Sequence, residues 1–584
     1  MEWATFGDSG GGRISLDQVV GELEKLPLDG VLGFLAAVSA DQQAVGAAVA
    51  DARWQANYLN RAIVDDFPTP LPGASRMYAP GRVPYTGGRY ALVHEQNMAL
   101  LTHLALLHAD TTSSADTVPE ALQRRLCRLL LLCNDLLSAR PTPTADTLTG
   151  RRELAVECLR HCQFNRFPGR WQRGHLTLAR HHVLLADCFP GSMNLDKIFI
   201  DALGVSLTEY FTALSAFLML LDEGVRPGQH WLSLASVFSQ VQGDRALLEK
   251  LMLGWSTTPK SYREEVSQRQ ARQRGGSSGD GFDFVPLRRT PFIEARPGQL
   301  VCPLPQFVKS KAEDEPYFRI SDELRTAERR QAFQSALGRA YHEYADRLVA
   351  RIARGDRGSP WQAGRTLQEG SELCDGLLIR GDTAVLFEHK GQRPDSVFTG
   401  GGESRRSVLG PTAKALARLE GGHAHGWLPS RKQDEGLLTR PLWQIARAGS
   451  RLIAGGTGLT DRTPMRVFPI VTHLAEVRVN PAARAIYLDR LVDLSGAFTS
   501  RPWRHPEWLH VEDLEALAAL ADRGELDLVA LLETKRKTAP KEGFDWFLHR
   551  QYPRADLADP VLKAKALELM NGAVGRFFPH LPAA

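Results

Sequence analysis

The sequence predicts an α/β region, a mixed sheet flanked by helices, preceded by a large and mostly α-helical domain. Three patterns predict this fold class. As far as residue 258, apolar residues recur at helical intervals. Between residues 372 and 392, two short apolar runs flank a Gly-Asp turn, which is typical of a β-hairpin. From residue 282 onward, strand-like runs and helical patterns alternate, as expected of a sheet covered by helices.

The length and composition are those of a folded protein with several domains. The 584 residues exceed what a single hydrophobic core usually organises. The apolar content of 43% and the charged content of 24% are those of a globular protein. The net charge is only +4, so a surface that binds phosphates would have to be local.

Residues 1–258 are predicted to form the helical domain. Segments 97–109 and 124–137 are apolar nearly all round, as expected of helices inside a bundle. A stretch rich in Pro and Gly at 67–88 is predicted to be a long loop. We expect this domain to bind a protein partner or to form a homo-oligomer.

A change of composition marks the predicted domain boundary. Residues 259–281 are charged, nearly free of apolar side chains, and end in Gly and Ser, which predicts a linker or solvated arm. Residues 282–584 then form the α/β domain. Within it we expect an irregular, Gly-rich insertion at 393–440 and a helical extension at 505–584. This extension includes one or two amphipathic helices over 511–532.

Cysteine usage and the lack of targeting patterns predict a cytoplasmic protein with no membrane segment. The seven cysteines are odd in number and lie mostly in apolar helical contexts, which favours free thiols in a reducing compartment. The first residues lack the basic and apolar regions of a signal peptide. The longest apolar segment, 207–221, contains Glu209 and is too short to span a bilayer.

One group of potential zinc ligands lies in the predicted helical domain. It consists of Cys158, His161, Cys162, His175, His181, His182 and Cys188. Zinc sites use these side chains, but the spacing matches no paired Cys-x-x-Cys pattern. We therefore favour core cysteines and surface histidines over a zinc enzyme.

The hairpin at 372–392 carries the residues with the clearest chemistry. Alternation along a strand sends Glu388 and Lys390 to one face and His389 to the other. Twelve residues separate Asp375 from Glu388, enough for one strand to run out and its partner to return. The two acids can therefore meet at one end of the pair, beside the Lys390 ammonium.

These residues suit metal-assisted hydrolysis of a phosphodiester. Mg²⁺ prefers oxygen ligands and usually takes one or two carboxylates from a protein. Asp375, Glu388 and the carbonyl of His389 offer such oxygens to Mg²⁺, or to Mn²⁺ in its place. Lys390 would orient the attacking water or stabilise negative charge on the phosphate. The plainer alternative is that Asp375 is a turn residue and that Glu388 and Lys390 form a solvated pair on an edge strand.

Asp375 followed by Glu388-x-Lys390 at a strand end resembles the PD-(D/E)XK nuclease superfamily, which has the restriction-endonuclease-like fold. The resemblance covers roughly residues 282–532. It rests on the order of helix, hairpin and helix more than on any single motif. A further strand, predicted at 465–474, would extend the sheet.

The resemblance also implies roles for the two flanking helices. The helix predicted at 331–353 commonly brings an acid to the metal site in this family, and Glu343 is the candidate. His342 is the alternative, because it too can occupy that position. The helix predicted at 441–453 often carries a site-facing Gln or Lys, which would be Gln444 here.

The function implied is a metal-dependent endonuclease acting on nucleic acid, with DNA favoured. Similarity to large bacterial members with accessory domains implies antiviral defence against phage or DNA processing. The alternative is a non-cleaving sensor that uses the same fold to bind nucleic acid or a protein partner. No G-x-x-x-x-G-K-[ST] pattern occurs in the sequence, so it predicts no nucleotide-driven step.

Overall fold

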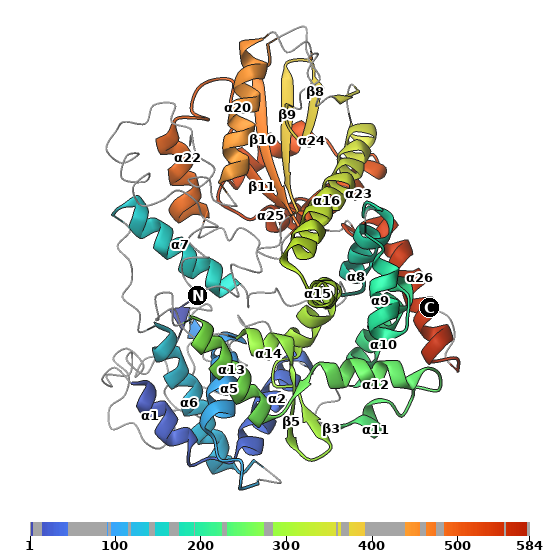
Figure 1. The fold of residues 1–584 in the computed structure, drawn as a ribbon. Helices are drawn as coiled ribbons and strands as arrows, with labels where there is room; N and C mark the ends of the chain where they lie inside the picture. The colour runs from blue at the N-terminus through green and yellow to red at the C-terminus, as the bar shows by residue number, and fades with distance from the viewer. Residues whose placement is uncertain are drawn as a thin grey trace.

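In the part of the chain that the structure describes, helices pack around a five-stranded and a four-stranded sheet, and one further pair of short strands is present (Figure 1). The structure is a computed structural model. The described residues are 2–3, 15–44, 90–91, 95–114, 118–138, 146–162, 174–191, 193–224, 231–273, 284–357, 360–363, 373–391, 439–455, 459, 463–474, 484–553 and 556–580.

The five-stranded sheet has β9 (Thr383–Lys390) at its centre. On one side β9 pairs in parallel with β10 (Arg466–His473), which pairs in parallel with β11 (Glu507–His510). On the other side it pairs antiparallel with β8 (Gly376–Arg380), which pairs antiparallel with β7 (Gln362–Ala363). The sheet is therefore mixed, and β10 confirms the strand predicted at 465–474.

The predicted hairpin is formed by β8 and β9. Its register pairs Gly376 with Phe387 and Arg380 with Thr383, leaving two residues in the turn. Gly381 has a φ of +58°, a left-handed conformation that a residue with a Cβ rarely adopts. A two-residue turn with a glycine at positive φ matches the twist of an antiparallel pair.

Each face of the sheet is covered by helices (Figure 1). On one face, α16 (Ala327–Gly355) and α23 (Val511–Asp522) share an apolar core with β9 through Phe387. On the other face, α20 (Arg440–Ala454) shares a core with β9 through Leu386. Neighbouring residues of β9 thus serve opposite layers, and the helices predicted at 331–353 and 441–453 are confirmed as α16 and α20.

Further helices complete these two layers. The α16 side also includes α24 (Leu528–Thr538) and α25 (Phe544–Gln551). The α20 side also includes η5 (Arg484–Leu488), α22 (Asp489–Ser495) and α7 (Leu148–Cys162). The range 511–532, predicted to hold one or two helices, contains α23 and the beginning of α24.

A third apolar core is built largely from N-terminal helices. Its members are α1 (Leu16–Leu23), α2 (Leu28–Ala44), α5 (Glu95–His108), α6 (Glu120–Ser138), α13 (Pro259–Gln273) and α14 (Val285–Arg289). The helices predicted at 97–109 and 124–137 are confirmed as α5 and α6. The short strands β1 (Glu2–Trp3) and β2 (Tyr90–Ala91) pair in parallel.

The segment expected to be a linker or solvated arm instead forms α13 over its first fifteen residues. Tyr262 is fully buried, and its hydroxyl lies 2.6 Å from Nδ1 of His103 in α5. Arg263 donates from Nε to the carbonyl of Leu106 at 2.8 Å. The burial of Tyr262 and Val266, one helical turn apart, and the hydrogen bond of Arg263 together dock this otherwise charged helix.

The four-stranded sheet crosses the predicted domain boundary. Its order is β3 (Trp231–Ser233), β6 (Gln299–Val301), β5 (Phe292–Arg296) and β4 (Ser256–Thr257). The outer strands precede residue 258 and the inner strands follow residue 282. Backbone pairing therefore joins the two regions that the sequence separates.

A fourth core crosses the same boundary. It brings together α8 (Gly174–His182), η3 (Val183–Asp187), α9 (Leu195–Leu203), α10 (Leu207–Gly224), α11 (Leu234–Val237), α12 (Arg245–Gly254), α15 (Pro305–Glu323) and α26 (Pro560–Phe577). Both α8 and α10 pack on α26, close to the C-terminal end. The extension predicted at 505–584 is thus not separate, since it begins with β11 and ends inside this core. The predicted insertion at 393–440 lies outside the described residues, except for residues 439 and 440.

Among the described residues, no single helix is both long and apolar enough to cross a membrane. One bent pair, Leu195–Leu203 with Leu207–Leu220, meets the criteria of length and composition only when the two helices are joined across a bend of 61°. Phe199 and Phe217 of this pair are fully buried.

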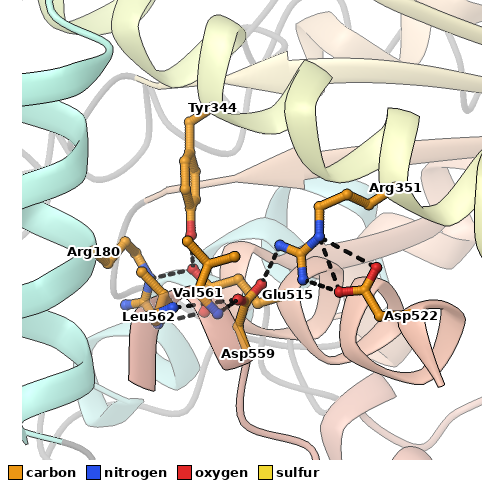
Figure 2. Close-up of polar contacts among 8 residues, drawn as sticks. All are labelled: Arg180, Tyr344, Arg351, Glu515, Asp522, Asp559, Val561 and Leu562. Atoms are coloured by element: carbon orange, nitrogen blue, oxygen red, sulfur yellow. Dashed lines mark hydrogen bonds and ion pairs between the residues drawn. The ribbon is translucent and has the colours of Figure 1, made fainter. Parts of the chain in front are cut away.

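Charged side chains between α8, α16, α23 and α26 form a buried network (Figure 2). Arg180 in α8 donates to both oxygens of Glu515 in α23, at 2.5 and 2.8 Å. Tyr344 in α16 donates to the same carboxylate at 2.8 Å. Burial raises the pKa of Glu515. Burial alone would lower the pKa of Arg180, but the Glu515 carboxylate raises it well above its ordinary value, so the guanidinium keeps its charge.

A second arginine extends this network along α16. Arg351 donates to Asp559 at 2.6 Å and to Asp522 at 2.6 Å (Figure 2). Asp559 caps α26 by accepting from the backbone N–H groups of Val561 and Leu562. The arginines therefore fix α16 to α23 and to the beginning of α26.

We expect Arg180→Met to lower the free energy of unfolding by about 3–5 kcal/mol, because Glu515 would remain as a buried and unpaired carboxylate. The double variant Arg180→Met, Glu515→Met should recover most of this loss, since it removes both charges. Urea unfolding followed by circular dichroism measures both effects. Lys197→Ala, from an exposed pair with Asp201, serves as the control and should change stability by less than about 0.5 kcal/mol. An Arg180→Met variant as stable as this control would contradict the role assigned to the pair.

Candidate active site

Asp375 and Glu388 meet at the open end of the hairpin. Asp375 immediately precedes β8, and continuation of the register from the pair of Gly376 and Phe387 places it opposite Glu388. Oδ2 of Asp375 accepts a hydrogen bond from the backbone N–H of His389 at 2.6 Å. This bond holds the aspartate against the end of β9, where the ladder between the two strands has stopped.

Lys390 lies on the same face of β9 as Glu388. Its Nζ donates to Oε1 of Glu388 at 2.7 Å. The Glu388 side chain is only 3% exposed, whereas that of Lys390 is 22% exposed. The ammonium therefore balances a buried carboxylate and remains accessible from outside.

The side chain of His389 points to the opposite face and is fully buried. Its Nδ1 lies 2.6 Å from the hydroxyl of Thr472 in β10, which also accepts from the Tyr341 hydroxyl at 3.1 Å. Burial raises the pKa of Tyr341, so its hydroxyl stays protonated. These contacts join β9, β10 and α16 directly behind the two acids.

The backbone of His389, in contrast, faces Asp375. Its N–H points toward β8, where it meets the Asp375 carboxylate. In a strand, the N–H and C=O of one residue point to the same side, and those of its neighbours point to the other side. Consistently, the carbonyl of Lys390 accepts from Leu474 on the β10 side. The His389 carbonyl is therefore directed to the side on which Asp375 lies.

The structure brings His342, and not Glu343, toward this site. Nδ1 of His342 lies 3.7 Å from Oδ1 of Asp375, and the imidazole is 39% exposed. Glu343 forms an ion pair with Arg347 at 3.0 Å, and its side chain is 53% exposed. Arg347 also donates to the carbonyl of Asp187, so Glu343 lies toward the end of η3. Consecutive helical residues diverge by about 100°, which is why only one of the two faces Asp375.

A close approach of two glycines positions α16 for this contact. Gly391 directly follows Lys390, and a Cβ on it would lie 2.8 Å from Cβ of Tyr341 and 3.1 Å from Cα of Gly338. Only a residue without a side chain lets the helix reach the end of β9 at this point. Neither glycine stood out in the sequence, where Gly391 reads as an ordinary residue of the loop after the strand.

Gln444 lies in the first half of α20 and is half-buried. In the described part of the chain, no hydrogen bond joins it to Asp375, Glu388 or Lys390, and its Oε1 has no hydrogen-bond partner. The helix itself is fixed to the sheet by Gly449, where a Cβ would overlap the ring of Trp503. The structure therefore places Gln444 on the covering helix without linking it to the acids.

Two histidines that the sequence analysis did not identify are the last residues of β10 and β11, at the same end of the sheet as Lys390. Register aligns Lys390 with His473 of β10, and His473 with His510 of β11. The two imidazoles are buried and pack edge to face, with ring centroids 5.5 Å apart. Because the three strands are parallel and in register, all three side chains lie on the Glu388 face. His473 ends the apolar run predicted as a strand at 465–474, and this is the signal that would have found it. His510 follows only Trp508 and Leu509, in a segment predicted to be helical, so the sequence offers no comparable signal for it.

Those potential zinc ligands whose side chains the structure describes, His175, His181, His182 and Cys188, are not gathered into a site. His181 packs its ring on Tyr317, with centroids 4.8 Å apart, and His182 lies 3.1 Å from the hydroxyl of Thr208. Both are buried, contrary to the expectation of surface histidines, and burial lowers the pKa of His182. Among the described residues, no group of three or more His, Cys, Asp or Glu side chains is arranged to hold a metal ion. The side chains of Cys158, His161 and Cys162 lie outside the description.

Comparisons with known proteins identify no relative of this chain. No protein-family model matches the chain, and neither a curated protein nor a solved structure matches it significantly.

We expect Gly391→Ala to lower the free energy of unfolding by about 1–3 kcal/mol, because α16 must move away from β9 to admit the methyl group. Urea unfolding measures this loss. Gly575→Ala in α26 is the matched control, since a Cβ there meets no atom within 4 Å. That control should be neutral or stabilising by up to about 1 kcal/mol. Equal stability of the two variants would show that the close approach is not required.

Proposed function

We propose that the protein is a metal-dependent nuclease that hydrolyses phosphodiester bonds of nucleic acid, with DNA as the favoured substrate. The observation that carries this proposal is the open end of the hairpin. There Asp375 lies opposite Glu388, and Lys390 bonds the buried carboxylate from the same face of β9. Two acids and a partly exposed ammonium at one strand end are the groups that metal-assisted phosphoryl transfer uses.

The residues present fit a hard divalent cation. Mg²⁺ usually takes one or two carboxylates and keeps several waters, so the pair of Asp375 and Glu388 is a sufficient set of charged ligands. The His389 carbonyl, directed to the Asp375 side, would add a neutral oxygen. The imidazole of His342 is a further donor beside Asp375. When bound, the metal would polarise the phosphate and lower the pKa of a coordinated water.

Lys390, Asp375 and His389 would then have separate roles. Lys390 bonds Glu388 and is partly exposed, so it would orient the water and stabilise negative charge that develops on the phosphate. Asp375 is held by the backbone of His389, so its carboxylate is already oriented before any ligand arrives. The buried contacts of the His389 ring keep this strand end rigid.

One observation favours a second function, a non-cleaving module that binds nucleic acid or a partner. The buried Glu388 is compensated by Lys390 at 2.7 Å, so the carboxylate does not need a metal ion for charge balance. A chain that uses the fold only for recognition would keep this pair. A role in bacterial antiviral defence stays a prediction that rests on the family resemblance alone.

Cleavage by the purified full chain tests the proposal directly. We expect Mg²⁺ or Mn²⁺ to support cutting of at least one substrate among supercoiled plasmid, linear duplex, single-stranded DNA and structured RNA, and EDTA to stop it. Lys390→Ala and Asp375→Asn should each lower the rate by about 10²-fold or more. Lys537→Ala, an exposed lysine of α24, is the control that should retain full activity. If neither the wild type nor any variant cuts, and calorimetry detects no binding of Mg²⁺ or Mn²⁺ to the wild type, the result favours the non-cleaving module.

A comparison of neighbours on α16 tests the assignment of His342. We expect His342→Ala to weaken metal binding or cleavage by about 10–100-fold, as for other groups that orient metal ligands. Glu343→Ala, one residue further and paired with Arg347, should change either quantity by less than about twofold. Titration of Mn²⁺ with a cleavage readout measures both. If Glu343→Ala had the large effect and His342→Ala changed little, Glu343 and not His342 would be the residue of α16 that belongs to the site.

A further inference from the structure

The hydroxyl of Thr472 is the middle member of a buried hydrogen-bond chain behind Asp375. Thr472 belongs to β10, and its side chain is fully buried. It accepts from the Tyr341 hydroxyl at 3.1 Å and lies 2.6 Å from Nδ1 of His389. Within the part of the chain that the structure describes, the hydroxyl has no further hydrogen-bond partner. Both of its capacities, to donate and to accept, therefore serve these two side chains.

The chain of bonds has a direction, which assigns the tautomer of His389. A hydroxyl donates one hydrogen and can accept through two lone pairs. Burial raises the pKa of Tyr341, so its hydroxyl keeps its hydrogen and donates to Thr472. If Nδ1 of His389 donated to Thr472 as well, the Thr472 hydrogen would be buried without an acceptor, which is costly. The bonding pattern thus assigns Thr472 as the donor to Nδ1, and places the proton of the neutral imidazole on Nε2.

The surroundings of the His389 ring agree with this assignment. Nε2 lies 3.9 Å from Oδ1 of Asp346, which follows His342 by one turn on α16. A carboxylate attracts an N–H and repels a nitrogen lone pair, so it favours the proton on Nε2. The ring also packs edge to face on Tyr341, with centroids 6.2 Å apart. The hydroxyl on one side and the carboxylate on the other therefore favour the same orientation of the imidazole.

His389 in turn contacts the groups of the proposed metal site. Its backbone N–H donates to Asp375 at 2.6 Å, and its carbonyl is directed to the same side. Its ring packs edge to face against that of His342, with centroids 5.9 Å apart. His342 itself lies 3.7 Å from Asp375. A rotation of the His389 ring would therefore withdraw the surface on which His342 packs and loosen the strand end that holds Asp375.

We infer that Thr472 is a positioning residue, whose hydroxyl orients the ring of His389 and thereby holds Asp375 and His342 in place. Thr472 is fully buried, so it acts through His389 and not on a substrate. The effect requires the hydroxyl, because valine has nearly the same shape but can neither donate nor accept. The orientation itself needs no ligand, and only its use for a metal ion rests on the proposed function.

The first test uses the metal-free full chain and no cleavage. His389 is the only histidine in the sequence that follows a glutamate. Labelling with carbonyl-¹³C glutamate and ¹⁵N histidine therefore identifies its backbone N–H by nuclear magnetic resonance. In Thr472→Val we expect this N–H to exchange with solvent about fivefold faster or more, because its bond to Asp375 is loosened. Thr472→Ser, which keeps the hydroxyl, should stay within about twofold of the wild type.

The second test is calorimetric titration with Mn²⁺. Thr472→Val should weaken binding by about 10–100-fold, as for other groups that orient metal ligands, whereas Thr472→Ser should stay within about threefold of the wild type. Thr102→Val is the matched control, since Thr102 is also fully buried and donates to the carbonyl of Met98 in α5. It should change neither the affinity nor the exchange of the His389 N–H. Circular dichroism and the thermal midpoint verify that each variant is folded.

Tyr341→Phe is the second variant, in case Thr472→Val does not fold. It removes the other donor of the chain but keeps the aromatic ring, and it should shift exchange and affinity in the same direction. Wild-type exchange in Thr472→Val, or in Tyr341→Phe where Thr472→Val is unfolded, would overturn the inference. So would a Thr472→Ser variant as impaired as Thr472→Val, because packing and not the hydroxyl would then decide.

The two tests separate this inference from the proposed function. If the wild type binds Mn²⁺ and cuts in a manner that depends on Lys390, but Thr472→Val matches it in exchange and affinity, the inference fails and the nuclease stands. If the wild type binds no metal and cuts no substrate, but Thr472→Val exchanges faster and Thr472→Ser does not, the hydroxyl orients His389 as inferred and the nuclease fails.

Discussion

The buried ion pair between Arg180 and Glu515 is the constraint on which the arrangement of the site depends. Tyr344 of α16 bonds the same carboxylate, so the pair sets the position of that helix against α23. One turn away on α16, Tyr341 bonds Thr472 and approaches Gly391, and His342 reaches Asp375. A residue of the N-terminal half thus helps to orient the groups at the end of the hairpin.

At that end, one strand carries two separate systems of side chains. The alternation of β9 sends Glu388 and Lys390 to the α20 face and the His389 ring to the α16 face. The first system is partly open to solvent and contains the groups that we propose to act on phosphate, whereas the second is fully buried. The backbone N–H of His389, whose ring belongs to the second system, also orients Asp375. The alternation of side chains along a single strand therefore separates the solvent-accessible groups of the site from the buried contacts that hold them in place.

Local patterns were enough to predict individual helices and strands. Contacts between segments that lie far apart in the sequence could not be predicted from such patterns. The hairpin, α16, α20 and β10 follow from apolar spacing and from a Gly-Asp turn, all within short windows. The docking of α13 was missed because the segment is otherwise charged, and its buried residues Tyr262 and Val266 form too short an apolar pattern to stand out. The shared cores were missed because Arg180 and Glu515 lie 335 residues apart. In the site, periodicity gave the helix near Asp375 but not whether His342 or Glu343 faces it, since that depends on a one-residue rotation.

The pairing of distant segments has a consequence during synthesis. Helix α8 is made early, yet its partner carboxylate Glu515 follows 335 residues later. At about 5–20 residues per second, the ribosome needs roughly 15–70 seconds to deliver it. During this interval Arg180 lacks its counter-ion, and the apolar surface of α8 and α10 lacks α26. The N-terminal half therefore emerges from the ribosome with this surface uncovered, and its packing is completed only when α26 has been made.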